Sequence, residues 1–177
     1  MQKDIQNQFN TYLSKFLPNL KTVRLSKFDK ADIANNFRIL QGGEINQYVI
    51  PWIKDNKPQI SPEINNRIEM ASKISINEIN AAKAFRKTLI KEVNNSLPEG
   101  DIALFPTAPF SAPICGQTDE ALGSDRKKIM EMTSIAGMTS RPQISIPKFK
   151  GKTGPVGISI LGWINSDEIL LNKLTEI

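Results

Sequence analysis

Ser124 and Lys127 have the spacing of a serine nucleophile and a lysine base, because the run SDRK fits the pattern Ser-x-x-Lys. A serine hydroxyl needs a neighbouring base of this kind before it attacks a carbonyl carbon. The run KTG at Lys152 adds a second motif that accompanies such pairs in some hydrolases, but the motif expected between them is missing. Only about two dozen residues separate the two runs. We therefore expect Ser124 to be a helix N-cap.

The chain contains no histidine, so it has no histidine-based triad, metal site or proton shuttle of its own. The one cysteine, Cys115, has no histidine to activate its thiol, and we expect it at a small apolar core or pocket position. A single cysteine forms no internal disulfide and is compatible with a reducing compartment.

The chain of 177 residues is long enough for one domain with a hydrophobic core. Its apolar runs are far shorter than the roughly 20 residues of a membrane span. The N-terminal run MQKDIQNQFN lacks the hydrophobic segment of a signal peptide. We therefore expect a cytoplasmic protein without membrane association, organised as a single unit over residues 1–177.

The net charge of +5 is modest, and acidic and basic residues are interleaved along the chain. Two basic clusters occur, at residues 126–128 and at Lys148, Lys150 and Lys152. A nucleic-acid-binding surface would combine a basic stripe with stacking aromatic side chains, and only Phe149 lies in such a cluster. We therefore expect no nucleic-acid partner.

The first half of the chain has the apolar spacing of helices. Apolar residues between Gln2 and Leu17 predict an amphipathic helix. A second helix is expected after Asp29, with Gly42-Gly43 bending or interrupting it, and we expect Tyr48 and Trp52 to pack on a sheet. Further helices are expected to start at two capping signals, Ser61-Pro62 and the pair Ser75 and Glu78.

Strand signals are concentrated in the second half of the chain. Apolar runs bounded by Pro or Gly predict strands at 102–105, 143–146 and 155–161, with one helix between the first two. A short additional strand is expected at residues 21–25. Helices that alternate with sparse strands favour the α/β class.

Three blocks of the second half resemble the amidase signature family. They are FPTAPFSAP from Phe105, TSIAGMTSRPQISIP from Thr133 and GPVGISILGWINSDEILL from Gly154, and they occur in the family's order at about its separations. The stretches FRILQGGEINQYVIPWI and NNRIEMASKISINEINAA also fit the family, most closely its plant-type branch. The resemblance implies the C-terminal portion of the amidase signature fold, an α/β domain in which helices flank a mixed β-sheet.

Amidase signature enzymes hydrolyse carboxamides with a serine that a lysine activates through a second serine, as the resemblance implies. In the family these serines lie in a Gly/Ser-rich run of the front half, and this chain has no such run. Its Gly123-Ser124 step lies in the back half, between the matched blocks. The resemblance therefore implies no catalytic residue, metal or organic cofactor in this chain, and no hydrolysis by the chain alone.

The resemblance also implies residues that line a substrate pocket. The turn after the strand at 102–105 and the segment around Gly137 border the acyl site in the family, which suggests substrate contacts for Thr107, Pro109 and Met138. The alternative is that the proline and threonine shape a turn while Met138 fills the core. Arg141 departs from the family pattern, because a small or apolar residue is more usual there.

Two functional hypotheses remain open. The chain is one half of a split amidase, acting on a small-molecule amide when a complementary N-terminal half joins it, or a non-catalytic binding protein or relic that reuses the fold. A sheet cut partway through exposes an unpaired edge strand and apolar surface on the order of several hundred Å². We therefore predict an obligate partner, either the complementary half or a second copy of the chain.

Overall fold

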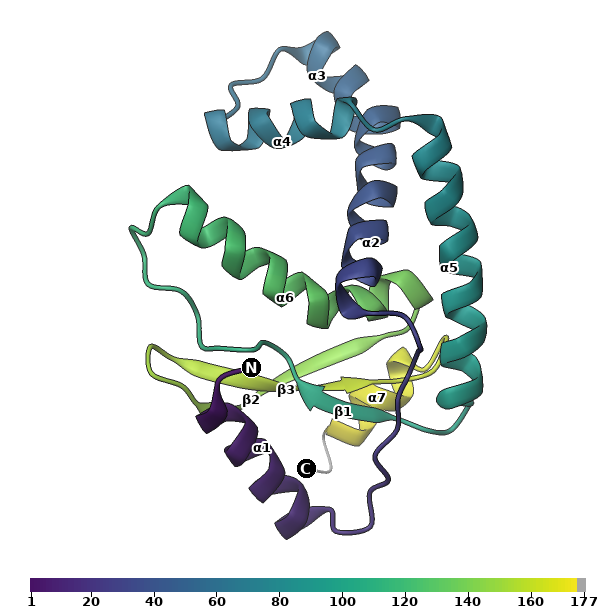
Figure 1. Ribbon diagram of the computed structural model, residues 1–177, viewed down its shortest axis with the longest axis vertical. Helices are drawn as coiled ribbons and strands as arrows, with labels where there is room; N and C mark the ends of the chain where they lie inside the picture. The colour runs from purple at the N-terminus through teal and green to yellow at the C-terminus, as the bar shows by residue number, and fades with distance from the viewer. Residues whose placement is uncertain (175–177) are drawn as a thin grey trace.

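The computed structural model describes residues 1–174, and the side chains of these residues except 119–121 and 173–174. It contains a three-stranded sheet with helices on both faces and a helical arm that projects from one end (Figure 1). In chain order the elements are α1 (Lys3–Phe16), α2 (Lys30–Glu44), the π-helix η1 (Ile45–Val49), α3 (Ile50–Asn56), α4 (Pro62–Ser72), α5 (Ile76–Ser96), β1 (Ala103–Pro106), α6 (Asp119–Thr139), β2 (Gln143–Lys150), β3 (Pro155–Leu161) and α7 (Asp167–Leu174).

The three strands pair antiparallel in the order β1-β3-β2. Residues 151–154 join β2 to β3, and a connection this short produces a hairpin. Ser159 in β3 pairs with Phe105 of β1 and with Ser145 of β2. The α/β class with a helix-flanked sheet is confirmed, although all described strand pairs are antiparallel where the sequence analysis expects a mixed sheet.

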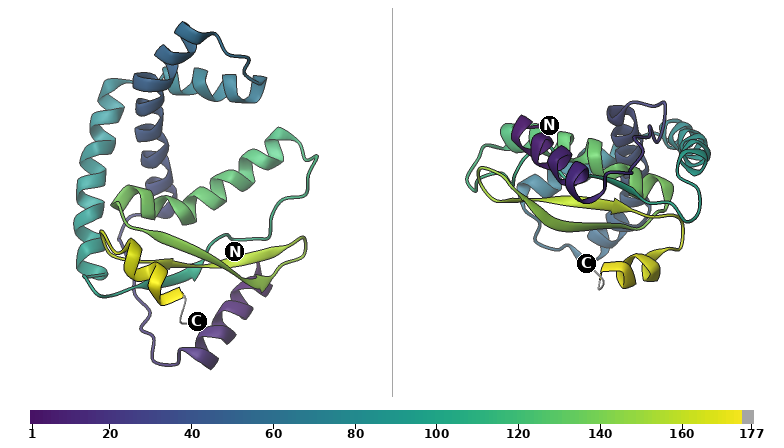
Figure 2. Two further views of the ribbon diagram at one scale, coloured as in Figure 1. Left: turned by 180° about the vertical axis from the view of Figure 1, so that it is seen from behind. Right: turned by 90° about the horizontal axis from the view of Figure 1, so that it is seen from below.

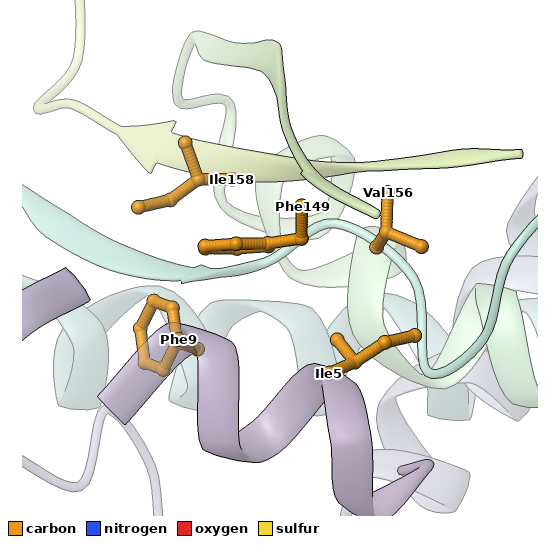
Figure 3. Close-up of a cluster of buried hydrophobic side chains, with 5 residues drawn as sticks. All are labelled: Ile5, Phe9, Phe149, Val156 and Ile158. Atoms are coloured by element: carbon orange, nitrogen blue, oxygen red, sulfur yellow. The ribbon is translucent and has the colours of Figure 1, made fainter. Parts of the chain in front are cut away.

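α1 covers one face of the sheet and forms an apolar core with it (Figure 3). Ile5 and Phe9 lie about one helical turn apart, so both project from the same side of α1. They pack on Phe149, Val156 and Ile158 of β2 and β3. The rings of Phe9 and Phe149 meet edge to face with centroids 6.0 Å apart. The predicted amphipathic N-terminal helix is confirmed.

α6 lies over the opposite face of the sheet, beside α2 and α5 (Figures 1 and 2). Leu161 is fully buried on this side with Leu97 and Ala103, and Ile135 of α6 packs against them. Buried side chains therefore hold α6 to the sheet. A further cluster joins α2, α5 and α6, and its members are Ile33, Leu89, Val93 and Met138.

The starts of α4 and α5 follow from local capping. The Ser61 hydroxyl accepts a hydrogen bond from the backbone N–H of Ile64, and Pro62 occupies the first turn, where its missing N–H leaves no bond unmade. Ser75 and Glu78 form a capping box, in which each side chain accepts from the other residue's backbone N–H. Both predicted helix starts are confirmed.

α2 runs through Gly42 and Gly43 to Glu44, so the expected interruption at these glycines is wrong. Both glycines permit close packing instead. A Cβ at Gly42 would collide with the side chain of Ile74, and one at Gly43 would lie 3.0 Å from Ile79. The missing side chains therefore let α2 approach α5 and the connection that precedes it, and η1 continues the helix directly.

The arm formed by η1, α3 and α4 stands away from the sheet (Figure 1). Tyr48 and Trp52 are 65% and 54% exposed, so the expectation that they pack on the sheet is wrong. The accessible surface measures 11630 Å² for a chain of 19.8 kDa. A compact monomer of that mass has about 8,600 Å² of accessible surface. The molecule therefore exposes roughly a third more surface than a compact monomer.

The connection between α1 and α2 runs past β1 without forming a strand (Figure 1). The prediction of a strand at residues 21–25 is therefore wrong. Leu25 packs its side chain against two core clusters, and its carbonyl accepts a hydrogen bond from the Ser96 hydroxyl at 3.0 Å. The apolar pattern of this segment thus reflects side-chain burial, and its main-chain contact is with α5.

Candidate functional site

Three hydroxyl side chains and one amide side chain meet on the same face of the sheet as Leu161. Oγ1 of Thr107 lies 2.8 Å from Oγ of Ser145 and 2.8 Å from Oγ of Ser159. Nε2 of Gln143 donates to Oγ of Ser159 at 2.7 Å. We call these four residues the hydroxyl cluster.

The register of the sheet positions the hydroxyl cluster. Ser145 and Ser159 are direct partners across β2 and β3, and residues two apart in a strand share a face. Thr107 follows β1, and its backbone N–H donates to the carbonyl of Gly157 at 2.8 Å. A Cβ at Gly157 would collide with the Ser145 hydroxyl and lie 2.8 Å from Oγ1 of Thr107. The glycine is therefore needed for the hydroxyl groups to meet.

The hydroxyl cluster offers hydrogen-bond donors and acceptors but no base. None of the hydrogen bonds that join its four members involves a Lys, Asp or Glu side chain. Ser159 is fully buried, and Oε1 of Gln143 has no hydrogen-bond partner among the described residues. A serine without an adjacent base or another activating group is a weak nucleophile. The hydroxyl cluster is thus suited to holding a polar group and not to attacking a carbonyl carbon.

Of the three predicted substrate contacts, only Thr107 belongs to the hydroxyl cluster. Pro109 is buried, and its carbonyl accepts from the backbone N–H of Gln2 at 2.8 Å. Met138 is 1% exposed and lies in the core cluster of α2, α5 and α6. The structure therefore places Thr107 and Met138 in different clusters, and a substrate-contact role for these three residues stays a prediction.

The sequence analysis misses Gln143, Ser145 and Ser159. A signal is present in the alternation of polar and apolar residues in QISI and GISI, which places every second side chain on one face. That alternation does not tell which residues of β1 and β2 meet Ser159. The strand register makes that choice, and the register is a tertiary property.

Ser124 and Cys115 do not lie where the sequence analysis expects them. Ser124 lies inside α6, which begins at Asp119, so its predicted role as an N-cap is wrong. The backbone N–H of Leu122 already bonds to the carbonyl of Thr118, which places the helix start ahead of Ser124. Cys115 is exposed on the segment between β1 and α6, so the predicted core or pocket position is also wrong.

Arg141 has a structural position that accounts for its departure from the family pattern. Its side chain is buried and donates to the carbonyls of Leu97 at 2.7 Å and Gly162 at 2.9 Å, and to Oδ1 of Asn94 at 2.9 Å. Desolvation lowers the pKa of the guanidinium, because burial disfavours its charged form. Arg141 therefore ties the end of α5 to the start of β2 and the end of β3.

A cleft of about 750 Å³, here called the β1 cleft, opens at the edge of the sheet that β1 forms. Residues 102–105 of β1 line it, α1 and α6 contribute from the two faces of the sheet, and the connection at 17–30 completes the lining. The apolar lining includes Leu13, Leu17, Leu20, Val23, Leu104, Phe105, Met132 and Ile135.

Neither a metal site nor a membrane-spanning helix occurs in the part of the chain that the structure describes. No three His, Cys, Asp or Glu residues gather there in a way that could hold a metal ion. No helix there is both long and apolar enough to cross a membrane.

The chain is similar to known amidases over most of its length. It is 31% identical over 145 residues to Amidase 1 of Arabidopsis thaliana, covering 82% of this chain and 34% of that protein. It is 24% identical over 173 residues to Translocon at the outer membrane of chloroplasts 64 of Pisum sativum, covering 94% of this chain and 29% of that protein. No protein-family model matches the chain.

The fold agrees with this similarity. A bacterial aryl acylamidase of the amidase signature enzymes family superposes with a TM-score of 0.70 at 16% identity, over 94% of this chain and 38% of that one. The structure therefore has the fold of part of an amidase signature enzyme. The chain is related to the amidase signature family and spans about a third of the length of the curated relatives that it matches.

Proposed function

We propose that this chain is the C-terminal part of an amidase domain, and that it supports carboxamide hydrolysis only together with the complementary N-terminal half of that domain. The observation that carries this proposal is a hydroxyl cluster without a base, in a chain about a third as long as its amidase relatives. The family's serines and lysine belong to the front half that this sequence lacks. Residues 1–177 then form one partial domain with no catalytic residue of their own.

The large exposed surface supports an assembly of this kind. The accessible surface of 11630 Å² exceeds that of a compact monomer by about 3,000 Å². Obligate interfaces bury roughly 2,000–5,000 Å² in total, which is about half that area on each partner, so the excess is at least as large as one partner's share of such an interface. In the assembled enzyme Thr107, Pro109 and Met138 would contact the small-molecule amide. A cytoplasmic location, suggested by the single free cysteine, is part of the same proposal.

Amide hydrolysis by the reconstituted pair tests this function. Ammonia release from indoleacetamide and short aliphatic amides is measured for the chain alone and after addition of the N-terminal two thirds of Arabidopsis thaliana Amidase 1. We expect no turnover by the chain alone and turnover by the pair. The variant Thr107→Val should lower turnover of the pair about tenfold or more, because it removes the hydroxyl that joins Ser145 to Ser159.

The matched control is Ser124→Ala on α6, which lies outside the hydroxyl cluster and should leave turnover unchanged. Turnover by the chain alone would contradict the proposal. A stable pair without any turnover would contradict it as well.

A second candidate function is non-catalytic binding by a protein that reuses the fold. Its supporting observation is the similarity, over 94% of this chain, to a relative whose name describes a translocon component and not a hydrolase. A stable pair that hydrolyses none of the amides would favour this function.

A further inference from the structure

The hairpin of β2 and β3 carries a hollow whose charged residues are all lysines. The hollow measures about 450 Å³, and Lys148, Lys150 and Lys152 line it. All three are exposed, and none of the ion pairs in the described part of the chain includes them. We call this feature the lysine hollow. Its other lining residues are Pro147, Phe149, Gly151, Gly154 and Pro155.

The segments that pack around the lysine hollow contain almost no acidic residues. The hairpin lies in a run without Asp or Glu that extends over residues 132–166, and residues 102–118 also lack both. α1 packs on the hairpin, and its one carboxylate belongs to Asp4, a full turn before Gln8, which contacts Lys150. The fold thus gathers segments that are far apart in the sequence and leaves the charge of the three lysines uncompensated.

Side chains from two other segments hold the turn of the hairpin in place. Nε2 of Gln8 donates to the carbonyl of Lys150 at 2.9 Å, and the N–H of Lys150 donates to Oε1 of Gln8 at 3.0 Å. Oγ1 of Thr153 donates to the carbonyl of Ala112 at 2.6 Å, and the N–H of Thr153 donates to Oγ of the buried Ser111 at 3.2 Å. The fold therefore orders the turn before any ligand binds, which lowers the entropic cost of binding.

The aromatic rings near the lysine hollow already have contacts of their own. Nζ of Lys148 lies 5.0 Å from the centroid of the Tyr12 ring, which also meets the rings of Phe16 and Phe149. Nζ of Lys15 lies 5.1 Å from the centroid of the Phe16 ring. Phe149, the only aromatic residue of the lining, is 5% exposed. Nucleobases stack on free aromatic faces, and helices that bind a membrane surface insert exposed apolar side chains, so this lining suits neither.

We propose that the lysine hollow binds an acidic segment of a partner protein, an extended stretch with carboxylates at alternate positions. Lys148, Lys150 and Lys152 alternate along the chain, and residues two apart in an extended chain are separated by about 6.6 Å. An extended segment with Asp or Glu at every second residue therefore spaces its carboxylates like the three ammonium groups. Each contact is a charge-assisted hydrogen bond.

Side-chain charges make this contact, because the strand offers little to main-chain pairing. Pro147 has no N–H to donate, and the N–H and C=O of Lys150 are already bonded to Gln8. The proposed amidase function uses neither the hairpin turn nor its lysines. The inference therefore stands independently of that function.

Binding of a labelled synthetic peptide, measured by fluorescence anisotropy, tests the inference. Glutamate alternates with threonine in the peptide, and glutamine replaces glutamate in its control. We expect the glutamate peptide to bind at least tenfold more tightly than the control, with an affinity that falls as salt is added. Equal binding of the two peptides would overturn the inference.

A pair of double variants separates the lysine hollow from the overall charge of the protein. Lys150→Gln with Lys152→Gln removes two charges from the hollow, and Lys148 stays because it also packs on an aromatic ring. Lys83→Gln with Lys87→Gln removes two exposed charges from α5 and is the matched control. We expect the first variant to weaken binding of the glutamate peptide at least fivefold and the second less than twofold. Equal weakening would show that binding follows net charge alone and would overturn the inference.

Amide NMR of the unchanged protein keeps the test valid even if a variant does not fold. The N–H signals of Gly151 and Gly154, which line the hollow, should shift on addition of the glutamate peptide. The signal of Gly100, in the turn before β1, should not shift. Shifts at Gly100 alone, or at none of the three glycines, would contradict the inference.

Further probes identify the occupant. A thymidine oligonucleotide of the same charge, and phosphatidylcholine vesicles that contain phosphatidylserine, are compared with the glutamate peptide. Tighter binding of either probe, lost in the variant of Lys150 and Lys152, would assign the hollow to a nucleic acid or a membrane and overturn the proposed occupant. A dimer of the chain that the same variant dissociates would also overturn it. Peptide binding in a protein that shows no amide turnover when reconstituted would support the inference and contradict only the proposed function.

Discussion

The face of the sheet toward α1 is filled by aromatic and aliphatic side chains such as Phe9 and Phe149, whereas the opposite face carries Ser145 and Ser159 in hydrogen-bond contact with Thr107. The first face needs only apolar volume in the right place, so helical periodicity and alternation are sufficient to build it. The second face requires hydroxyl groups that belong to three separate segments to come within hydrogen-bond distance of one another. The difference shows that the α1 face is held by apolar packing alone, whereas the opposite face combines apolar packing with hydrogen bonds between hydroxyl groups.

The largest expected effect is on the apolar face. Phe149→Ala should lower the free energy of unfolding by about 3–5 kcal/mol, because it removes the ring that packs on Phe9 and Tyr12 and leaves a cavity. Urea denaturation measures the change. Phe16→Ala is the control, since that ring is 59% exposed, and it should cost less than about 1 kcal/mol. Equal losses would mean that the α1 face is not the stabilising one.

A smaller effect is expected on the hydroxyl face. Gly157→Ala forces a methyl group into the contact between Thr107 and Ser145, so unfolding free energy should fall by about 1–3 kcal/mol. Gly154→Ala, in the hairpin turn, meets no atom within 4 Å and is the matched control. Thermal unfolding of the two variants compares them. A similar melting temperature for both would show that the hydroxyl groups can separate without cost.

The smallest expected effect is the loss of folding stability in acid, and neither face of the sheet should cause it. No carboxylate takes part in the hydrogen bonds that join the hydroxyl cluster, and none belongs to the α1 core. Glu92 on α5 accepts from the Ser26 hydroxyl at 2.6 Å and pairs with Lys27 at 3.0 Å. The Ser26 hydrogen bond, followed by the contacts with Lys27, holds the pKa of Glu92 below its ordinary value of 4.5.

A carboxyl group with a lowered pKa stabilises the folded state above its unfolded pKa, and this contribution is lost as the pH falls through the folded value. Stability should therefore decrease below about pH 4.5, and Glu92→Gln should flatten that decrease. Urea midpoints between about pH 3 and about pH 6 measure it, with Glu99→Gln at an exposed turn as the control. An unchanged pH dependence in Glu92→Gln would exclude Glu92 as the source.

Local signals predicted the elements whose formation depends on neighbouring residues. Ser61 and the Ser75–Glu78 pair start their helices as expected, since capping bonds join residues three apart. Predictions that required a distant partner were less reliable. The segment at 21–25 has strand-like residues but no strand beside it, and Trp52 is apolar yet lies on an arm that leaves the sheet.

The amino-acid sequence determines that this chain is amidase-related and lacks a Gly/Ser-rich catalytic run, because both are properties of residue order alone. It also determines where α4 and α5 start, through capping bonds within one turn. Only the tertiary structure decides that Thr107, Ser145 and Ser159 share one hydrogen-bonded cluster and that β1 keeps an unpaired edge inside a cleft. Strand order and register bring together residues 38 and 52 positions apart, and no local pattern specifies which strands become neighbours.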